Sequence, residues 1–161
     1  GSTLGYEFEP VMSRDIVVGG GQALPLLYNN TGTFVDLNGG LASILVSEIS
    51  RSLTPAQDLP RDGATALTLW VRGDPINIAE ATDSLYVSVK DAAGSEAVAV
   101  VASPADLVKS YWQQKTIDLS SLAGVDVSRV TEIIIGIGNR TSPQTGGLGT
   151  VLIDDIVLSA D

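Results

Sequence analysis

Two neighbouring stretches decide the fold of this chain: TALTLWVR at residues 65–72 and SLYVSVKD at residues 84–91. In the middle of each stretch every second residue is Leu or Val, and the residues between them are mostly polar or aromatic. Side chains alternate between the two faces of a β-strand, so this period of two predicts strands with one face in an apolar core.

Similar short runs occur along the rest of the chain, separated by turn clusters rich in Gly, Asn, Asp and Pro. They cover residues 4–9, 23–29, 41–49, 96–102, 112–119, 131–138 and 150–158. This spacing predicts an all-β fold, a two-sheet antiparallel β-sandwich. We expect residues 51–63 to be an exposed connection between strands. In residues 103–110, Ser103 and Pro104 predict a short helical turn, as cap and first helical residue.

The length of 161 residues is typical of one domain, which we place at residues 3–161. Gly1-Ser2 resembles the remainder of a cleaved affinity tag, so we expect a piece of a larger protein. The chain has no cysteine and no histidine. It therefore has no disulfide, no thiolate or imidazole metal ligand and no Ser-His-Asp triad.

Nine basic residues against 19 acidic ones give a net charge of −10. This sign is unfavourable for binding a phosphate backbone, so we expect no nucleic-acid partner. The longest apolar runs have the length of strands and are far shorter than the ~20 residues that span a bilayer. We therefore expect no membrane-spanning segment.

The outward faces of the two opening stretches carry aromatic and cationic side chains. Trp70 and Arg72 lie outward on the first stretch, and Tyr86 and Lys90 lie outward on the second. We expect the two strands to share a sheet, so that these side chains form one surface. A pyranose ring stacks on an aromatic ring, and its hydroxyls bond to charged groups, so this surface suits sugar binding. The alternative is that Trp70 and Tyr86 form a cross-strand pair covered by a loop.

Two pairs of carboxylates interrupt apolar strands: Glu7 and Glu9 in YEFEP, and Asp154 and Asp155 in LIDDIVL. If the ends of the chain lie together, these groups repel each other unless a cation lies between them. Calcium fits, because it binds about six to eight oxygen ligands. The alternative turns one member of each pair to solvent and satisfies the other with Arg or Lys.

The order of these segments resembles a known family. The segments that carry the resemblance are FE (8–9), ALPLLYNN (23–30), LTLWVRG (67–73), LYVSVKDAAG (85–94), WQQKTIDLSSLAGVDVSRVTEIIIGIG (112–138) and GTVLIDDIVL (149–158). Together they resemble the jelly-roll, galactose-binding-like carbohydrate-binding modules of secreted bacterial glycoside hydrolases. The resemblance covers nearly the whole chain and implies jelly-roll topology.

The resemblance also implies a set of site residues. A structural calcium would join the first and last strands through Glu9 and Asp154, with Glu7 and Asp155 as further candidates and backbone carbonyls of residues 19–22 as additional ligands. The sugar site would lie on a concave sheet face, formed by Tyr28, Trp70, Arg72, Tyr86 and Lys90. In other members of the family the sugar binds at loop tips. Aromatic residues make up only 5% of the chain, so a single soluble polysaccharide chain fits better than a crystalline surface.

Three further residues have two interpretations each. Trp112 is either another stacking residue or an edge-strand residue that covers the core. Asn139 and Arg140 follow a strand end, where they either reach the rim of a ligand or cap the turn.

We therefore expect a non-catalytic, monomeric carbohydrate-binding module, secreted or on the cell surface, that targets a larger protein to plant or microbial polysaccharide. The aromatic and cationic residues are compatible with β-glucan, xylan, mannan and uronic-acid polymers, with single β-glucan or xylan-type chains favoured. The alternative is a structural or adhesion domain that binds another protein domain. An enzyme is disfavoured, because calcium accounts for the carboxylate pairs that a glycosidase would need.

Overall fold

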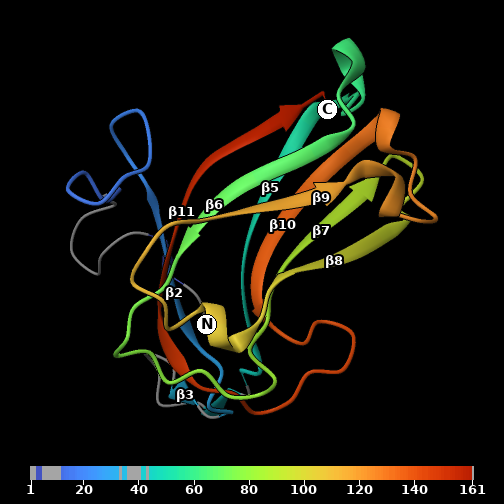
Figure 1. Ribbon diagram of the computed structural model, residues 1–161. Helices are drawn as coiled ribbons and strands as arrows, with labels where there is room; N and C mark the ends of the chain where they lie inside the picture. The colour runs from blue at the N-terminus through green and yellow to red at the C-terminus, as the bar shows by residue number, and fades with distance from the viewer. Residues whose placement is uncertain (1–2, 5–11, 33, 36–40, 43, 161) are drawn as a thin grey trace.

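The computed structural model describes residues 3–4, 12–32, 34–35, 41–42 and 44–160. The strands form two antiparallel sheets that pack against each other, and one short two-stranded ribbon (Figure 1). The five-stranded sheet has the order β1 (Thr3–Leu4), β2 (Leu24–Asn29), β11 (Leu148–Ser159), β6 (Ala66–Arg72) and β9 (Gln113–Asp118). The four-stranded sheet has the order β5 (Val46–Gln57), β10 (Val130–Gly138), β7 (Leu85–Asp91) and β8 (Glu96–Ala102). The ribbon consists of β3 (Phe34–Val35) and β4 (Leu41–Ala42).

The core lies between the two sheets and is built from the inward faces of their strands. The aliphatic residues of β6 and β7 that the sequence assigned to the core are all at most 3% exposed: Leu67, Leu69, Val71, Leu85, Val87 and Val89. Full burial of such a side chain contributes about 1.5–3 kcal/mol. The alternation that predicted the strands therefore also predicted the faces that pack together.

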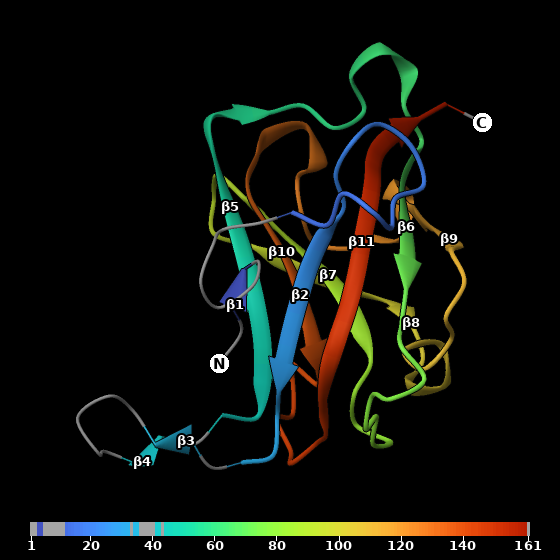
Figure 2. The ribbon, with the colours of Figure 1, turned by 90° about the vertical axis from the view of Figure 1, so that its left-hand side faces the viewer.

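Strands that are far apart in the sequence pair with each other. β11 lies between β2 and β6, and β10 lies between β5 and β7. Figure 2 shows β2, β11 and β6 running side by side. β6 and β7 follow each other in the chain but belong to different sheets. The predicted all-β sandwich with jelly-roll topology is confirmed.

The prediction of an exposed connection at residues 51–63 was wrong for its first half. β5 continues to Gln57, and its partner β10 shifts register between Val130 and Glu132. β5 is an edge strand of its sheet, and an edge strand tolerates Pro55 because one side of it needs no ladder hydrogen bonds. This segment is rich in polar and turn residues, so its composition did not indicate a strand.

The described helices are four 3-10 turns of three residues each: η1 (Arg61–Gly63), η2 (Pro104–Asp106), η3 (Leu119–Ser121) and η4 (Val127–Arg129). The helical turn predicted from Ser103 and Pro104 is confirmed by η2. The Asp106 carboxylate accepts hydrogen bonds from the Ser103 backbone N–H (3.0 Å) and hydroxyl (2.9 Å) and from the ammonium groups of Lys109 and Lys115. No helix in the described part of the chain has the length and apolar character that crossing a membrane requires.

Candidate functional site

The outward residues of β6 and β7 lie on opposite sides of the molecule. Trp70 and Arg72 are on the outer face of the five-stranded sheet, whereas Tyr86 and Lys90 are on the outer face of the four-stranded sheet. The prediction of one shared aromatic surface, and that of a Trp70–Tyr86 cross-strand pair, were therefore wrong. Alternation shows which side chains point away from the core, but it does not show which sheet a strand joins.

Tyr28 was also predicted to face the sugar, and this prediction was wrong. Its side chain points into the core from β2 and is 3% exposed. The hydroxyl donates a hydrogen bond to the backbone carbonyl of Ile78 (3.2 Å). Burial, reinforced by the nearby Asp83 carboxylate, raises the pKa of Tyr28 well above its ordinary value. Tyr28 is thus a packing residue with one satisfied polar atom.

Tyr86 lies flat across the outer face of the four-stranded sheet. It extends from β7 over Gly136 of β10 and donates a hydrogen bond to the carboxylate of Glu48 on β5. A Cβ at Gly136 would lie 2.4 Å from the Tyr86 Cζ atom, so only glycine leaves room for the ring. Burial, together with the bond to Glu48, raises the pKa of Tyr86. The ring is 1% exposed, so a sugar cannot stack on it in this conformation.

Arg140 joins two carboxylates next to Tyr86. Its Nη1 donates to Glu48, and its Nε donates to Glu96 Oε1 at 2.6 Å. The Ser88 hydroxyl donates to the same Glu96 oxygen. We call these five residues, Glu48, Tyr86, Ser88, Glu96 and Arg140, the Arg140 cluster. Its members come from three strands, β5, β7 and β8, and from the loop after β10.

The ionisable groups of the cluster stabilise each other's charges. The bond to Glu48, and less strongly the one to Glu96, raises the already high pKa of Arg140. Burial alone would raise the pKa of Glu96, but bonds from Ser88 and Arg140 outweigh it and hold this pKa below its ordinary value. Glu96 and Arg140 therefore stay charged at neutral pH.

A hollow of about 440 Å³ opens at the cluster. Its lining combines charged and aliphatic side chains: Val46, Glu48, Glu96, Val98, Arg140 and Thr141. Val100, two residues after Val98 on β8, is 68% exposed. On the same face, Lys90, the cross-strand partner of Glu96, forms an ion pair with Glu132 on β10 at 3.1 Å. Of the residues predicted to bind sugar, the structure thus gathers Tyr86, Lys90 and Arg140 on one face.

The loop that carries Arg140 is closed at its base by two fully buried residues, Asn30 and Asp83. The Asn30 side-chain amide donates to the Ile137 carbonyl (2.9 Å) before the loop and to Asp83 Oδ1 (3.0 Å). Asp83 Oδ2 accepts the backbone N–H of Gly147 (2.7 Å) after the loop and that of Glu80 (2.8 Å). These bonds hold the two ends of residues 138–147 together and set the point from which Arg140 starts. We call Asn30 and Asp83 the loop clamp.

Asn139 adopts the second of its two predicted roles. Its side-chain oxygen accepts hydrogen bonds from the backbone N–H of Ser142 (3.0 Å) and the hydroxyl of Thr141 (3.1 Å). It therefore caps the turn at the start of the loop, beside Arg140.

On the opposite face, Trp70 is half-buried between Asp154 of β11 and Gln114 of β9, its partners in the strand register. Arg72 pairs with Leu152 of β11, and Trp112 stands half-buried one residue before β9. The Trp70 indole and the Arg72 guanidinium thus lie on this face, and neither residue lines the hollow at the Arg140 cluster.

The two aspartates of the last strand have different environments. Asp154 is 7% exposed, and its two oxygens accept the backbone N–H groups of Val18 and Asp155, both at 2.8 Å. A β-bulge follows Asp154, and Asp155 (φ 44°) turns out into solvent. Asp155 is thus outward, as the alternative for this pair expected, whereas backbone N–H groups and not Arg or Lys satisfy Asp154.

Glu7 and Glu9 lie outside the described residues. Among the residues that are described, no three carboxylates gather closely enough to hold a metal ion. Each oxygen of Asp154 accepts one hydrogen bond and has one further lone pair, so its chemistry fits a calcium ligand.

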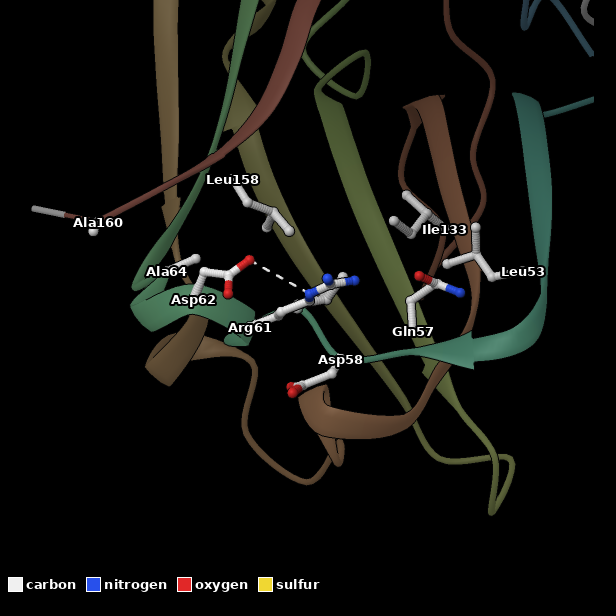
Figure 3. Close-up of a pocket in the computed structure, with 10 residues that line it drawn as sticks. Leu53, Gln57, Asp58, Arg61, Asp62, Ala64, Ile133, Leu158 and Ala160 are labelled. Atoms are coloured by element: carbon white, nitrogen blue, oxygen red, sulfur yellow. Dashed lines mark ion pairs between the residues drawn. The ribbon is translucent and has the colours of Figure 1, made fainter.

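A second hollow, of about 490 Å³, lies at one end of the sandwich, where the end of β5, η1 and the end of β11 meet (Figure 3). Leu53, Ile133 and Leu158 line it, and its rim carries the ion pair of Arg61 and Asp62. These two side chains are 75% and 87% exposed, and such surface pairs contribute about 0–1 kcal/mol. The Arg140 cluster, with its coupled and half-buried charges, is the better candidate site.

No family model matches the sequence, and no curated protein matches it. Solved structures do match. One is the family 30 carbohydrate-binding module of the cellulosomal cellulase Cel9D-Cel44B of Clostridium thermocellum, with a TM-score of 0.61 at 16% identity, over 94% of this chain and 82% of that chain. The fold is that of a carbohydrate-binding module.

Two other matches extend this result. An exo-β-agarase matches with a TM-score of 0.63 at 11% identity, and 100% of this chain covers only 22% of the agarase. A structure of carbohydrate-binding modules of the β-sandwich superfamily matches with a TM-score of 0.54 at 12% identity, over 97% of this chain and 52% of that chain. The predicted resemblance is therefore confirmed at the level of the fold.

Sequence reasoning missed the carboxylates of the Arg140 cluster and the loop clamp. Glu96 lies in the run EAVAVVA, where its period of two places it on the same face as Val98 and Val100. Glu48 has the same outward position on β5. The sequence pattern thus indicated that both glutamates point outward. That they lie close together follows only once β5, β10, β7 and β8 are known to be neighbours in one sheet.

Proposed function

We propose that this chain is a non-catalytic carbohydrate-binding module, and that a polysaccharide chain lies across the outer face of the four-stranded sheet at the Arg140 cluster. The observation that carries this proposal is the hollow in which one guanidinium and two carboxylates are held rigidly beside aliphatic side chains. The fold shared with carbohydrate-binding modules supports it.

The chemistry of the cluster suits a sugar ring. Vicinal hydroxyls donate to carboxylates and accept from guanidinium N–H groups, so Arg140 and its carboxylates can bind a diol through paired hydrogen bonds. The exposed Val98 and Val100 offer an aliphatic surface to the C–H face of a neighbouring ring. Tyr86 acts beneath this layer, because its hydroxyl orients Glu48. Hydrogen bonds from the charged groups of the cluster therefore make the first contact with the sugar, and aromatic stacking takes no part in that contact.

Binding of this kind is weak and non-catalytic. Each hydrogen bond contributes about 0.5–1.5 kcal/mol net, or somewhat more with a charged partner, so a few of them give micromolar to millimolar affinity. A glycosidase needs a carboxylic acid that keeps its proton, whereas the bonds to Glu96 favour its ionised form. Weak binding suits a module that holds a larger enzyme near its polysaccharide.

The two arginines on opposite faces provide the test. A panel of soluble polysaccharides would be screened by affinity electrophoresis and calorimetry with the wild type, Arg140→Ala and Arg72→Ala. We expect Arg140→Ala to lose detectable binding, and Arg72→Ala, also combined with Trp70→Ala, to retain it. Loss of binding only in the Arg72 and Trp70 variants would place the sugar on the five-stranded sheet. Binding to no polysaccharide would refute the module function and favour the adhesion domain.

We also propose a structural calcium, bound by Asp154 and by Glu9, with Glu7, Asp155 and backbone carbonyls of residues 19–22 as further candidates. When bound, the ion would link the first and last strands electrostatically. At a concentration of one hundred times Kd it would stabilise the fold by roughly 2.7 kcal/mol. Excess chelator should therefore lower the melting temperature of the wild type by several degrees and leave that of Asp154→Asn unchanged. Equal melting curves of the wild type with and without verified metal would contradict the site.

The location follows from the same reasoning. The matched structures include a module of a cellulosomal cellulase and part of an agarase, of which this chain covers 22%. We propose that this chain likewise serves as a monomeric module within a larger extracellular protein that acts on polysaccharide.

A further inference from the structure

Every cation on the candidate face is already paired with a carboxylate. Among the described residues of this face, Arg140 binds Glu48 and Glu96, and Lys90 binds Glu132. In these ion pairs of the described residues, three carboxylates thus surround two cations. The whole chain has the same excess, with a net charge of −10.

These pairs are partly shielded from water. The side chains of Arg140, Glu48 and Glu96 are 21%, 27% and 28% exposed, and those of Lys90 and Glu132 are 33% and 26% exposed. A ligand carboxylate could reach the N–H groups of Arg140 that Glu48 and Glu96 leave free, but the guanidinium charge that it meets there is already balanced by these two carboxylates. The ligand carboxylate would also approach both of them at short range, where like charges repel.

We propose that this site selects neutral polysaccharide chains and rejects chains whose sugars carry carboxylate groups. The inference rests on the proposed function and specifies its ligand class. From the sequence, uronic-acid polymers were compatible ligands, because Arg and Lys lie near aromatic residues. The ion pairs argue against such ligands, since they neutralise these cations. Arg140 recognises hydroxyls with the N–H groups that its carboxylates leave free, and no net positive charge remains to attract an anionic chain.

The test compares polymers that share a backbone and differ in charge. The pairs are hydroxyethyl- and carboxymethyl-cellulose, arabinoxylan and glucuronoxylan, and methyl-esterified and de-esterified homogalacturonan. Retardation in affinity gels and calorimetric Kd would be measured at about 10 mM and about 500 mM salt, where the Debye length falls from about 30 Å to below about 5 Å. At low salt we expect the neutral member of a bound pair to bind at least about tenfold more tightly, and high salt to narrow this ratio.

A charge variant checks the cause. Glu132→Gln removes one carboxylate of the face, changes no member of the Arg140 cluster and leaves Lys90 beside Glu96, so it should bring the affinity ratio closer to one at low salt. Glu80→Gln is the matched control, because it removes the same charge from an exposed residue outside the face, and it should leave the ratio unchanged.

The outcomes separate the two proposals. Equal binding of both members at low salt, tighter binding of the carboxylated member, or an unchanged ratio in Glu132→Gln would overturn charge selection and leave the module function standing. Failure of every neutral polymer to bind, at either salt concentration, would overturn the module function itself.

Discussion

Removal of the Asp83 side chain should destabilise this domain more than any surface substitution. Asp83 is fully buried, and its carboxylate accepts hydrogen bonds from the Asn30 side chain and from the backbone N–H groups of Glu80 and Gly147. In Asp83→Ala the Asn30 amide keeps its bond to Ile137, but both backbone N–H groups lose their acceptor.

The size of the effect follows from these two orphaned donors. A buried donor without a partner costs about 1–3 kcal/mol, so the substitution should lower the free energy of unfolding by about 2–6 kcal/mol. A domain of this size has about 5–15 kcal/mol in total. Each kcal/mol shifts the melting temperature by about 2–4 °C, so a loss near the middle of the range corresponds to about 8–16 °C.

Urea unfolding followed by circular dichroism and tryptophan fluorescence would measure this loss. Asp74→Ala is the matched control, because Asp74 accepts one hydrogen bond at an exposed site, from the N–H of Ile76 at 3.0 Å. It should cost less than about 1 kcal/mol. If Asp83→Ala cost no more than Asp74→Ala, the loop clamp would not hold the fold together. If the clamp also places Arg140, Asp83→Ala should weaken polysaccharide binding under conditions where it remains folded.

Two further predictions concern packing and pH. Gly136→Ala would place a Cβ 2.4 Å from the Tyr86 ring, so we expect a loss of about 1–3 kcal/mol and a more exposed tyrosine in ultraviolet difference spectra, whereas Gly21→Ala, with open space around it, should be neutral. Burial alone would raise the pKa of Asp106, but Lys109, the Ser103 N–H and Lys115 outweigh it and hold this pKa far below its ordinary value. The stabilisation by its charged form is therefore complete above about pH 4 and declines as the pH falls below that value, so the melting temperatures of the wild type and Asp106→Asn should converge in acid. A constant difference between them down to pH 2 would contradict the ion-paired role of Asp106.

The local pattern predicted much of the fold. The alternation in residues 65–72 and 84–91 identified the strands and their core faces, because a side chain's face depends only on its position along one strand. Ser103 and Pro104 identified η2 for a similar reason, since capping involves neighbouring residues. β5 was predicted too short, because the polar second half of an edge strand lacks the apolar period that marks a buried one.

The site was predictable only in part. Tyr86, Lys90 and Arg140 were identified as binding candidates, and the structure gathers them on one face, while the ligand itself stays a prediction. The predictions that Tyr28 faces the sugar and that Trp70 and Tyr86 share a surface were wrong. Both depended on which strands pair and on which way each sheet faces. The loop clamp could not be predicted from the sequence, because Asn30 and Asp83 are 53 residues apart and no local pattern marks either of them.

By itself, the sequence determined three properties: the absence of cysteine and histidine chemistry, the all-β fold class, and which face of each central strand is apolar. These properties follow from composition and from a period of two, and they need no knowledge of distant residues. Only the tertiary structure decided that β6 and β7 belong to different sheets, that Gly136 makes room for Tyr86, and that Arg140 lies between Glu48 and Glu96. Each of these depends on contacts between residues far apart in the chain, which form when the whole sandwich closes around its core and every strand takes its one register.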